Sequence, residues 1–190
     1  PISDDLLRQL KSVSDEWLKM VQGSEKKFSL GWFDEAYLRE CEVVVVHSPD
    51  GGISAFANIV SEFQLNEITN DMMRHRSTIE NGTMDFLFVS MLQHYKEEGY
   101  DSFNFGLSAL AGVGKTSESR RLERLLNYLY EHLNRFYNFQ GVHSYKEKFR
   151  PRWEPRYLVY PSLTALPDVI VALIRADSGD RLLDYFKPET

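Results

Sequence analysis

The stretch that decides the fold is Glu42-Val-Val-Val-Val-His47, followed by Pro49-Asp-Gly-Gly52 and then by Ile53-Ser-Ala-Phe-Ala-Asn-Ile-Val-Ser-Glu-Phe63. β-Branched and apolar residues fill the first run, and apolar residues alternate well enough in the second run to form a strand. The segment between them has the composition of a tight turn, so the two runs are predicted to pair as an antiparallel hairpin. A third strand is expected from Asn66 to Arg74, which extends the hairpin into a meander.

Helical patterns lie on both sides of these strands. Ser3 is followed by two acidic residues, as an N-cap often is, and apolar residues then recur at helical spacing as far as Leu18. The other expected elements are a helix over Asp34–Glu40, a helix over Gly82–Glu98, a short strand from Ser102, an amphipathic helix over Ser117–Asn134, a strand over Arg156–Tyr160 and a helix over Thr164–Ala176. The predicted fold class is therefore α/β of the α+β kind, with a mostly antiparallel central sheet flanked by helices in a single domain over residues 1–190.

Composition limits the class of protein. The chain has 190 residues, of which 43% are hydrophobic, 13% aromatic and 26% charged, values typical of a soluble globular protein. The longest apolar runs, such as Val169–Ile174, are far shorter than the roughly 20 residues that cross a bilayer. The single cysteine, Cys41, excludes an internal disulfide and indicates a reducing compartment. The chain shows no secretory signal and begins without methionine, so it is expected to be a fragment of a larger protein.

Charge is unevenly distributed along the chain. The net charge is −6, yet residues 115–156 carry 10 basic and 5 acidic side chains, whereas residues 1–114 carry 9 and 18. A basic segment is often only a solvated face, but it is also where a polyanion such as RNA or an acidic lipid headgroup would bind. Four cations of this segment are the candidate RNA-binding residues: Lys115, Arg120, Arg121 and Arg124.

Several catalytic patterns are incomplete or absent. Ala109-Leu-Ala-Gly-Val-Gly-Lys-Thr116 resembles a phosphate-binding loop with Ala in place of its first Gly. Such a loop follows an apolar strand of a parallel sheet and needs a second strand ending in a magnesium-binding Asp, so a flexible Gly-rich turn is expected here instead. The five histidines have no metal-ligand spacing and there is no G-x-S-x-G pattern, so neither a metal site nor a serine nucleophile is predicted.

Two polar clusters suggest a site. Asn70-Asp-Met-Met-Arg-His-Arg76 is a charged group at the end of an apolar strand, and Gly82-Thr-Met-Asp85 opens a buried helix soon after it. The acid and the base could equally form a structural ion pair, and the acid in the first helical turn could simply complement the helix dipole. The second cluster, residues 136–157, alternates cations with aromatic rings, and it could equally be a packed segment whose Lys and Arg side chains reach outward.

These clusters and other motifs, in their order along the chain, closely resemble a known family. The motifs are Gly31-Trp-Phe-Asp-Glu-Ala-Tyr-Leu, Ala55-Phe-Ala-Asn, Asp71-Met-Met-Arg74, Asn81-Gly-Thr-Met-Asp-Phe-Leu-Phe, Asn104-Phe-Gly-Leu-Ser, Phe136-Tyr-Asn-Phe-Gln-Gly, Tyr145-Lys-Glu-Lys-Phe and Trp153-Glu-Pro-Arg-Tyr. They resemble the C-terminal catalytic domain of phosphatidylglycerol lysyltransferases, also called multiple peptide resistance factors or aminoacyl-phosphatidylglycerol synthases. The resemblance extends from Ile2 to about Ala176 and implies a GNAT-like acyltransferase fold, here as the second of two such units in tandem.

The resemblance also implies an activity and partners. It implies transfer of an aminoacyl group, usually lysyl and sometimes alanyl, from aminoacyl-tRNA to phosphatidylglycerol, which alters lipid charge and gives resistance to cationic antimicrobial peptides. The implied partners are aminoacyl-tRNA, phosphatidylglycerol, an N-terminal GNAT-like unit and a transmembrane flippase part. The implied location is the cytoplasmic face of a bacterial cell membrane. No cofactor is expected, because the loop from Arg74 to Gly82 lacks the Q/R-x-x-G-x-G/A pattern that holds the pyrophosphate of acetyl-CoA.

Carried over by matching motif, the resemblance implies the residues of the site. The catalytic residues are expected to be Asp71, Arg74 and Lys146, and the substrate-binding residues are expected to be Asp85, Lys148, Trp153, Glu154 and Arg156. Asp71 or Asp85 would hold the cationic amino group of the substrate. Arg74 and Lys146 would bind phosphate or the developing negative charge, and the identity of the general base stays open.

Strand geometry places a condition on this site. Residues i and i+3 of an extended strand point to opposite faces, so Asp71 and Arg74 can share a pocket only if the strand bulges or ends between them. Regular pairing is therefore predicted to break within Asp71–Arg74, exposing both side chains to a cleft that Lys146 also lines. Two other functions stay open: a CoA-dependent N-acyltransferase, and a non-catalytic RNA- or membrane-binding module that uses the basic segment alone.

Overall fold

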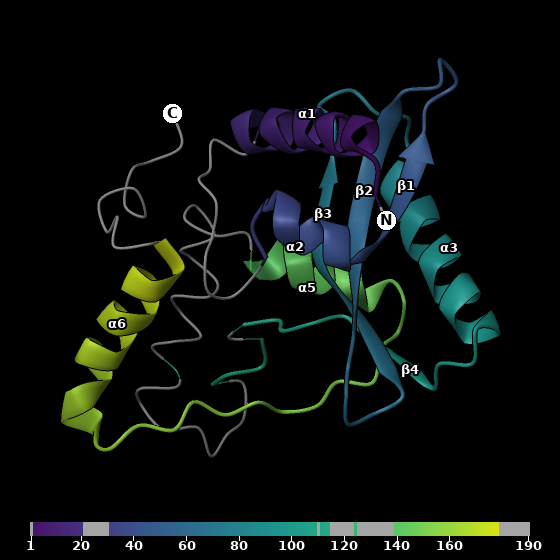
Figure 1. The fold of residues 1–190 in the computed structure, drawn as a ribbon. Coiled ribbons are helices and arrows are strands. Elements are labelled where there is room, and N and C mark those ends of the chain that lie inside the picture. The colour runs from purple at the N-terminus through teal and green to yellow at the C-terminus, as the bar shows by residue number, and fades with distance from the viewer. Residues whose placement is uncertain (1, 21–30, 110, 115–123, 125–138, 179–190) are drawn as a thin grey trace. The chain divides into compact units, whose positions relative to one another are not determined.

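The computed structural model describes residues 2–20, 31–109, 111–114, 124 and 139–178 (Figure 1). The chain divides into two compact units, one formed by Pro1–Gly106 with Asp177–Gly179 and the other by Leu107–Ala176 with Asp180–Thr190. All the described strands belong to the first unit. That residues 1–190 act as one domain stays a prediction.

A four-stranded sheet forms the centre of the first unit. Its strands are β1 (Glu42–His47), β2 (Ile53–Ser61), β3 (Glu67–His75) and β4 (Ser102–Asn104), in that spatial order. β1 pairs with β2 and β2 with β3 in antiparallel fashion, whereas β4 joins β3 in parallel. The predicted meander and the mostly antiparallel sheet are confirmed.

Helices cover both faces of this sheet (Figure 1). α1 (Asp4–Met20) and α2 (Glu35–Glu40) share one core with β2 and β3, while α3 (Thr83–Glu97) packs on the other face against β1, β2 and β4. The expected cap of α1 is confirmed, because Ser3 Oγ accepts a hydrogen bond from the Leu6 backbone N–H at 3.2 Å.

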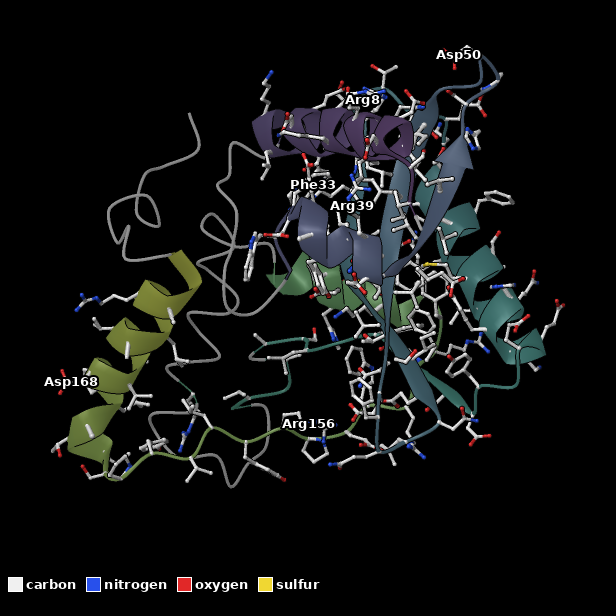
Figure 2. The ribbon with its side chains drawn as sticks, in the orientation of Figure 1. Arg8, Phe33, Arg39, Asp50, Arg156 and Asp168 are labelled. Atoms are coloured by element: carbon white, nitrogen blue, oxygen red, sulfur yellow. The ribbon has the colours of Figure 1, made fainter. Side chains whose placement is uncertain are left out.

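An apolar cluster lies between the sheet and its first two helices. Its buried members are Leu7, Leu10, Val13, Leu38, Ile53, Phe56 and Met72. Arg39 attaches α2 to the start of α1 (Figure 2 labels Arg39). Its guanidinium donates to the Ile2 carbonyl at 3.0 Å and pairs with Asp4. α2 and the residues that lead into it are thereby held over the middle of β3.

β3 bulges where a break in pairing was predicted. Ala57 pairs with Met73 and Ile59 with Asn70, so two residues of β3 face one residue of β2. An extra residue reverses the alternation of side chains beyond it. Asp71 contacts α2 and Arg74 contacts α1, so both side chains point to the same face of the sheet. The prediction of irregular pairing within Asp71–Arg74 is confirmed.

The second unit contains α5 (Phe139–Glu147), a 3₁₀ turn η1 (Leu163–Ala165) and α6 (Leu166–Ser178). α6 confirms the expected terminal helix. α5 was not predicted, because glycine and aromatic residues give its sequence, FQGVHSYKE, a low helix propensity. The amphipathic helix predicted over Ser117–Asn134 lies outside the described residues except for Arg124.

The strand predicted over Arg156–Tyr160 is wrong. Residues 151–160 adopt no strand in the part of the chain that the structure describes, and Tyr157 and Val159 are 82% and 89% exposed (Figure 2 labels Arg156 in this segment). β-Propensity reflects the packing of a side chain on a paired strand, so a run of Tyr, Leu and Val does not form one without a neighbour.

Two further features concern the Gly-rich segment and the length of the helices. Of the Gly-rich segment Ala109–Thr116, the described residues 111–114 form turns, as expected, with positive φ at Gly112 and Gly114. Within the described residues, no helix has both the length and the apolar character required to cross a membrane.

Candidate active site

Asp71 lies half-buried in the bulge of β3 and accepts hydrogen bonds from two residues distant in sequence. The Gly31 backbone N–H donates to its Oδ1 at 2.7 Å, and the Tyr37 hydroxyl donates to its Oδ2 at 2.9 Å. Because each carboxylate oxygen has its own donor, the carboxylate is held in one orientation. Both donors come from α2 and the segment before it.

Gly31 is a glycine because Asp71 approaches its backbone so closely. A Cβ atom at this position would lie 2.1 Å from Oδ2 and 2.7 Å from Cγ of Asp71. Any side chain there would displace the carboxylate, so the site requires glycine for close approach. The Gly-Trp-Phe motif was noticed in the sequence, but its glycine was not predicted to belong to the site.

Tyr37 is held as a neutral hydrogen-bond donor. Burial, followed by the hydrogen bond to Asp71, raises the pKa of its hydroxyl above the ordinary value of 10.0. The hydroxyl oxygen also lies 3.4 Å from Nδ2 of Asn58, a fully buried residue of β2. Neither residue was predicted. An asparagine in the middle of a largely apolar strand is the sequence signal that could have pointed to them.

Arg74 is buried beneath α1, with 4% of its surface exposed. Its guanidinium donates to Ser14 and lies 5.2 Å from the centre of the Trp17 ring. The expectation that Arg74 is exposed to a cleft is therefore wrong, because α1 covers this end of β3. Its part in the reaction stays a prediction.

Glu16 of α1 fastens the chain that leaves β3. Its carboxylate accepts hydrogen bonds from the Ser77 hydroxyl at 2.5 Å, from the Ser77 N–H at 2.8 Å and from Arg76 at 2.8 Å. These hydrogen bonds, those of Ser77 first, lower the pKa of Glu16 to about 2. The C-terminal end of β3 is thus tied to α1 at two successive residues.

Asp85 lies half-buried in the first turn of α3. α3 covers the face of the sheet opposite to α2, so the expected grouping of Asp85 with Asp71 is not seen among the described residues. Its role in substrate binding stays a prediction.

In the second unit, Lys146 occupies the last turn of α5. Its Nζ donates to the Leu107 carbonyl at 2.9 Å, and burial lowers the pKa of Lys146 from 10.5 to about 8. The amine is mainly protonated at neutral pH but gives up its proton far more readily than an exposed lysine. This property suits a group that donates to developing negative charge or exchanges a proton.

Further polar and aromatic contacts surround α5. The His143 ring lies 4.6 Å from the Trp153 ring, and its Nδ1 lies 3.3 Å from Ser108 Oγ. Trp153 Nε1 donates to Glu147 Oε2 at 2.6 Å, which fastens the chain after α5 back onto the helix. The expected residue Trp153 therefore has a structural contact, while Ser108, His143 and Glu147 were not predicted.

The remaining predicted residues lie at the surface or outside the described chain. Lys148 Nζ lies 4.9 Å from the Tyr145 ring, and exposed Glu154 pairs with Arg152 at 2.8 Å and Arg156 at 3.9 Å. Arg124 is helical and exposed, and Lys115, Arg120 and Arg121 lie outside the described residues. No group of three or more His, Cys, Asp or Glu side chains among the described residues could hold a metal ion.

The structure is a mixed α/β fold in which the Asp71 carboxylate is held by two donors on a bulged strand. Comparison with known proteins identifies the family. The family described as "Phosphatidylglycerol lysyltransferase, C-terminal" matches residues 1–160. The chain belongs to this family.

Named relatives and solved structures agree with this assignment. The phosphatidylglycerol lysyltransferase of Bacillus subtilis strain 168 is 42% identical over 160 residues, 84% of this chain and 18% of that protein, and one from Staphylococcus epidermidis is 37% identical over 175 residues, 92% and 21%. The structure of L-PGS from Bacillus licheniformis superposes with a TM-score of 0.77 at 37% identity, over 96% of this chain and 54% of that one. A C-terminal domain of a lysylphosphatidylglycerol synthetase from Agrobacterium fabrum gives 0.74 at 40% identity, over 93% and 52%.

These similarities confirm the predicted family and fold class. The chain spans about a fifth of the length of these curated relatives and about half of the solved chains.

Proposed function

We propose that this chain is the part of a phosphatidylglycerol lysyltransferase that transfers a lysyl group from aminoacyl-tRNA to a hydroxyl of phosphatidylglycerol. The observation that carries the proposal is membership of the lysyltransferase family over residues 1–160. In this proposal the chain works beside a second GNAT-like unit of a larger protein, which also has a transmembrane flippase part. The reaction takes place at the cytoplasmic face of a bacterial membrane. Its product reduces the negative charge of the lipid surface and gives resistance to cationic peptides.

The proposed reaction needs little machinery. The oxygen of the lipid hydroxyl attacks the ester carbonyl, the bond from that carbonyl to the tRNA ribose breaks, and the proton of the lipid hydroxyl ends on the released ribose. Because the ester is already activated, the protein has only to orient the substrates, move this proton and stabilise the tetrahedral oxyanion. The balance requires no cofactor.

The geometry of each unit supports particular roles. Asp71, whose carboxylate is held by two donors, is proposed to bind the ammonium group of lysine. Protonated Lys146 is proposed to stabilise phosphate or the oxyanion, and Arg74 of β3 is proposed to contribute the same sign of charge from its place beneath α1. The residues proposed to shape substrate binding are Asp85, Lys148, Trp153, Glu154 and Arg156.

The experiment is transfer of radiolabelled lysine from charged tRNA to vesicles that contain phosphatidylglycerol. It compares this chain with a longer protein, called the tandem unit. The tandem unit contains this chain together with the region of the solved relatives that this chain does not cover. We expect labelled lipid from the tandem unit, and a parallel reaction with alanyl-tRNA defines the amino-acid preference.

Two outcomes would replace the proposal. Stabilisation by acetyl-CoA in a thermal-shift measurement, without labelled lipid, would favour a CoA-dependent N-acyltransferase. Binding of tRNA or vesicles without transfer by the tandem unit would favour a non-catalytic module.

The proposed tRNA contact is tested through its salt dependence. Each phosphate that the basic segment neutralises contributes a slope of roughly −0.7 to −0.9 to the log–log plot of affinity against salt. Reversing the charges of Arg120, Arg121 and Arg124 together is expected to weaken tRNA binding and to flatten this slope while the chemical step is unchanged. Unchanged affinity would place the RNA site on another part of the protein.

A further inference from the structure

Asn58 occupies the place in the sheet where β3 bulges. It is fully buried, and it alone faces both Asp71 and Met72. The Met72 backbone N–H donates to its Oδ1 at 2.7 Å. The side chain of Asn58 thereby satisfies a backbone donor that the bulge removes from the regular ladder.

This contact fixes the direction of the hydrogen bonds that follow. A backbone N–H can only donate, so the oxygen of the Asn58 amide must face Met72 and the nitrogen must face away from it. That nitrogen lies 3.4 Å from Tyr37 Oη, which accepts from it. The phenol proton is then directed to Asp71 Oδ2, 2.9 Å away.

The hydrogen bonds therefore form a closed ring. They run from Met72 to Asn58, from Asn58 to Tyr37 and from Tyr37 to Asp71, and the peptide bond joins Asp71 back to Met72. The bulge that turns Asp71 toward α2 and the hydroxyl that orients its carboxylate thus depend on one another.

From this ring we infer that Tyr37 is a positioning residue for aminoacyl transfer: it sets the orientation of the Asp71 carboxylate and acts on the reaction only through it. The inference rests on the proposed function, since it requires Asp71 to bind the substrate. Gly31 holds the other oxygen with its backbone N–H, and any substitution there would also place a Cβ atom against Asp71. Tyr37 is therefore the donor that a single substitution can delete without moving the carboxylate by a clash.

The test deletes only the hydroxyl. Tyr37→Phe keeps the ring and its packing but leaves Asp71 Oδ2 without this donor. The matched control is Tyr100→Phe, which deletes a hydroxyl 3.4 Å from Ser61 Oγ, at the far end of β2. Both variants are made in the tandem unit, and kcat, KM and the melting temperature are measured for lysyl transfer.

We expect Tyr37→Phe to lower kcat about tenfold, because small displacements of a positioned group reduce rates steeply. Its melting temperature should fall no more than that of Tyr100→Phe, whose kcat should be unchanged. A purely structural role would instead lower the melting temperature and leave kcat equal to that of the control.

A double-mutant cycle with Asp71→Asn decides the inference. If Tyr37 acts only through Asp71, adding Tyr37→Phe to Asp71→Asn should slow transfer no further. Independent effects that multiply, or a Tyr37→Phe variant as active as the control, would overturn the inference while Asp71→Asn still supports the proposed site. Normal turnover by Asp71→Asn alone would overturn the proposed site and the inference with it.

Discussion

The first unit presents a carboxylate and the second an amine, and the two groups are prepared in different ways. Asp71 is fixed by donors: a backbone N–H and a phenol each hold one oxygen, and a bulge sets the direction of the side chain. Lys146 is prepared by loss of water, since burial lowers its pKa to about 8 and one carbonyl accepts its hydrogen bond. The contribution of Asp71 to transfer should therefore be sensitive to displacement of the carboxylate, and the contribution of Lys146 should be sensitive to pH.

The largest effect is expected from Gly31→Ala, which tests how strongly transfer depends on the position of the Asp71 carboxylate. A Cβ atom here would lie 2.1 Å from Asp71 Oδ2, so the carboxylate must move. We expect lysyl transfer by the tandem unit to fall at least about 10²-fold, the scale for misplacing a catalytic group by about 1 Å.

Gly52→Ala is the matched control for that substitution. Its Cβ atom would meet only the side chains of Asp50, at 3.3 Å, and Ser48, at 3.5 Å, in the β1–β2 turn. Transfer should stay within about twofold of the unsubstituted protein, as for a surface change of small energy. Equal loss in the two glycine variants would show that backbone stiffening, and not displacement of Asp71, is responsible.

Arg74→Lys probes the buried cation with its charge kept. Lysine has no planar guanidinium to lie over the Trp17 ring while it also donates to Ser14. We expect about a tenfold loss of transfer and a lower melting temperature, and at least about 10² loss of transfer for Arg74→Ala. A protein that only binds RNA or membrane would keep its affinity in the charge-preserving variant, so kinetics and tRNA affinity are measured together.

The rate of lysyl transfer should depend on pH through the protonation of Lys146. If its protonated form stabilises negative charge, transfer should decline as pH rises through about 8, and Lys146→Arg, which stays charged, should lack that decline. Lys146→Met should reduce transfer at neutral pH about tenfold. A rate that rises through about 8 would instead identify Lys146 as the general base.

The stability linked to Lys146 should change in the opposite direction. Its pKa is lower in the folded protein than in the unfolded chain, so the unfolded chain binds more protons between about 8 and 10.5. The free energy of unfolding should therefore rise with pH across this window, and Lys146→Met should remove that part of the rise. Denaturant titrations at a series of pH values measure it.

The smallest effect is expected from Glu16→Gln, which should change acid stability and not transfer. The pKa of Glu16 is lowered from 4.5 to about 2, so its contribution is complete above about 4.5 and is lost as pH falls to about 2. For this partly exposed group we expect a difference on the order of 1 kcal/mol at neutral pH. A stability gap that persists below pH 2 would contradict this origin.

Local sequence patterns predicted most of the first unit. The valine run of β1, the Pro-Asp-Gly-Gly turn and the cap at Ser3 are short-range signals, and each element formed within one or two residues of its expected limits. The break in β3 was predictable as well, because residues three apart cannot share a face of a regular strand.

Contacts between distant residues were not predictable in this way. Gly31 and Tyr37 reach Asp71 across 40 and 34 positions of the chain, and no local pattern encodes those distances. Arg74 was expected to face a cleft together with Asp71, but α1 arrives from 60 positions away and covers it. The Arg156–Tyr160 strand failed for the same reason, since pairing requires a neighbour that its own residues do not specify.

The most direct test of the account is single-turnover lysyl transfer by Asp71→Asn in the tandem unit, with Asp101→Asn, an exposed site before β4, as control. The account predicts a rate at least about 10²-fold lower for Asp71→Asn, the scale for losing one catalytic group, with an unchanged far-UV spectrum and a control of normal rate. Near-normal transfer by Asp71→Asn would contradict it.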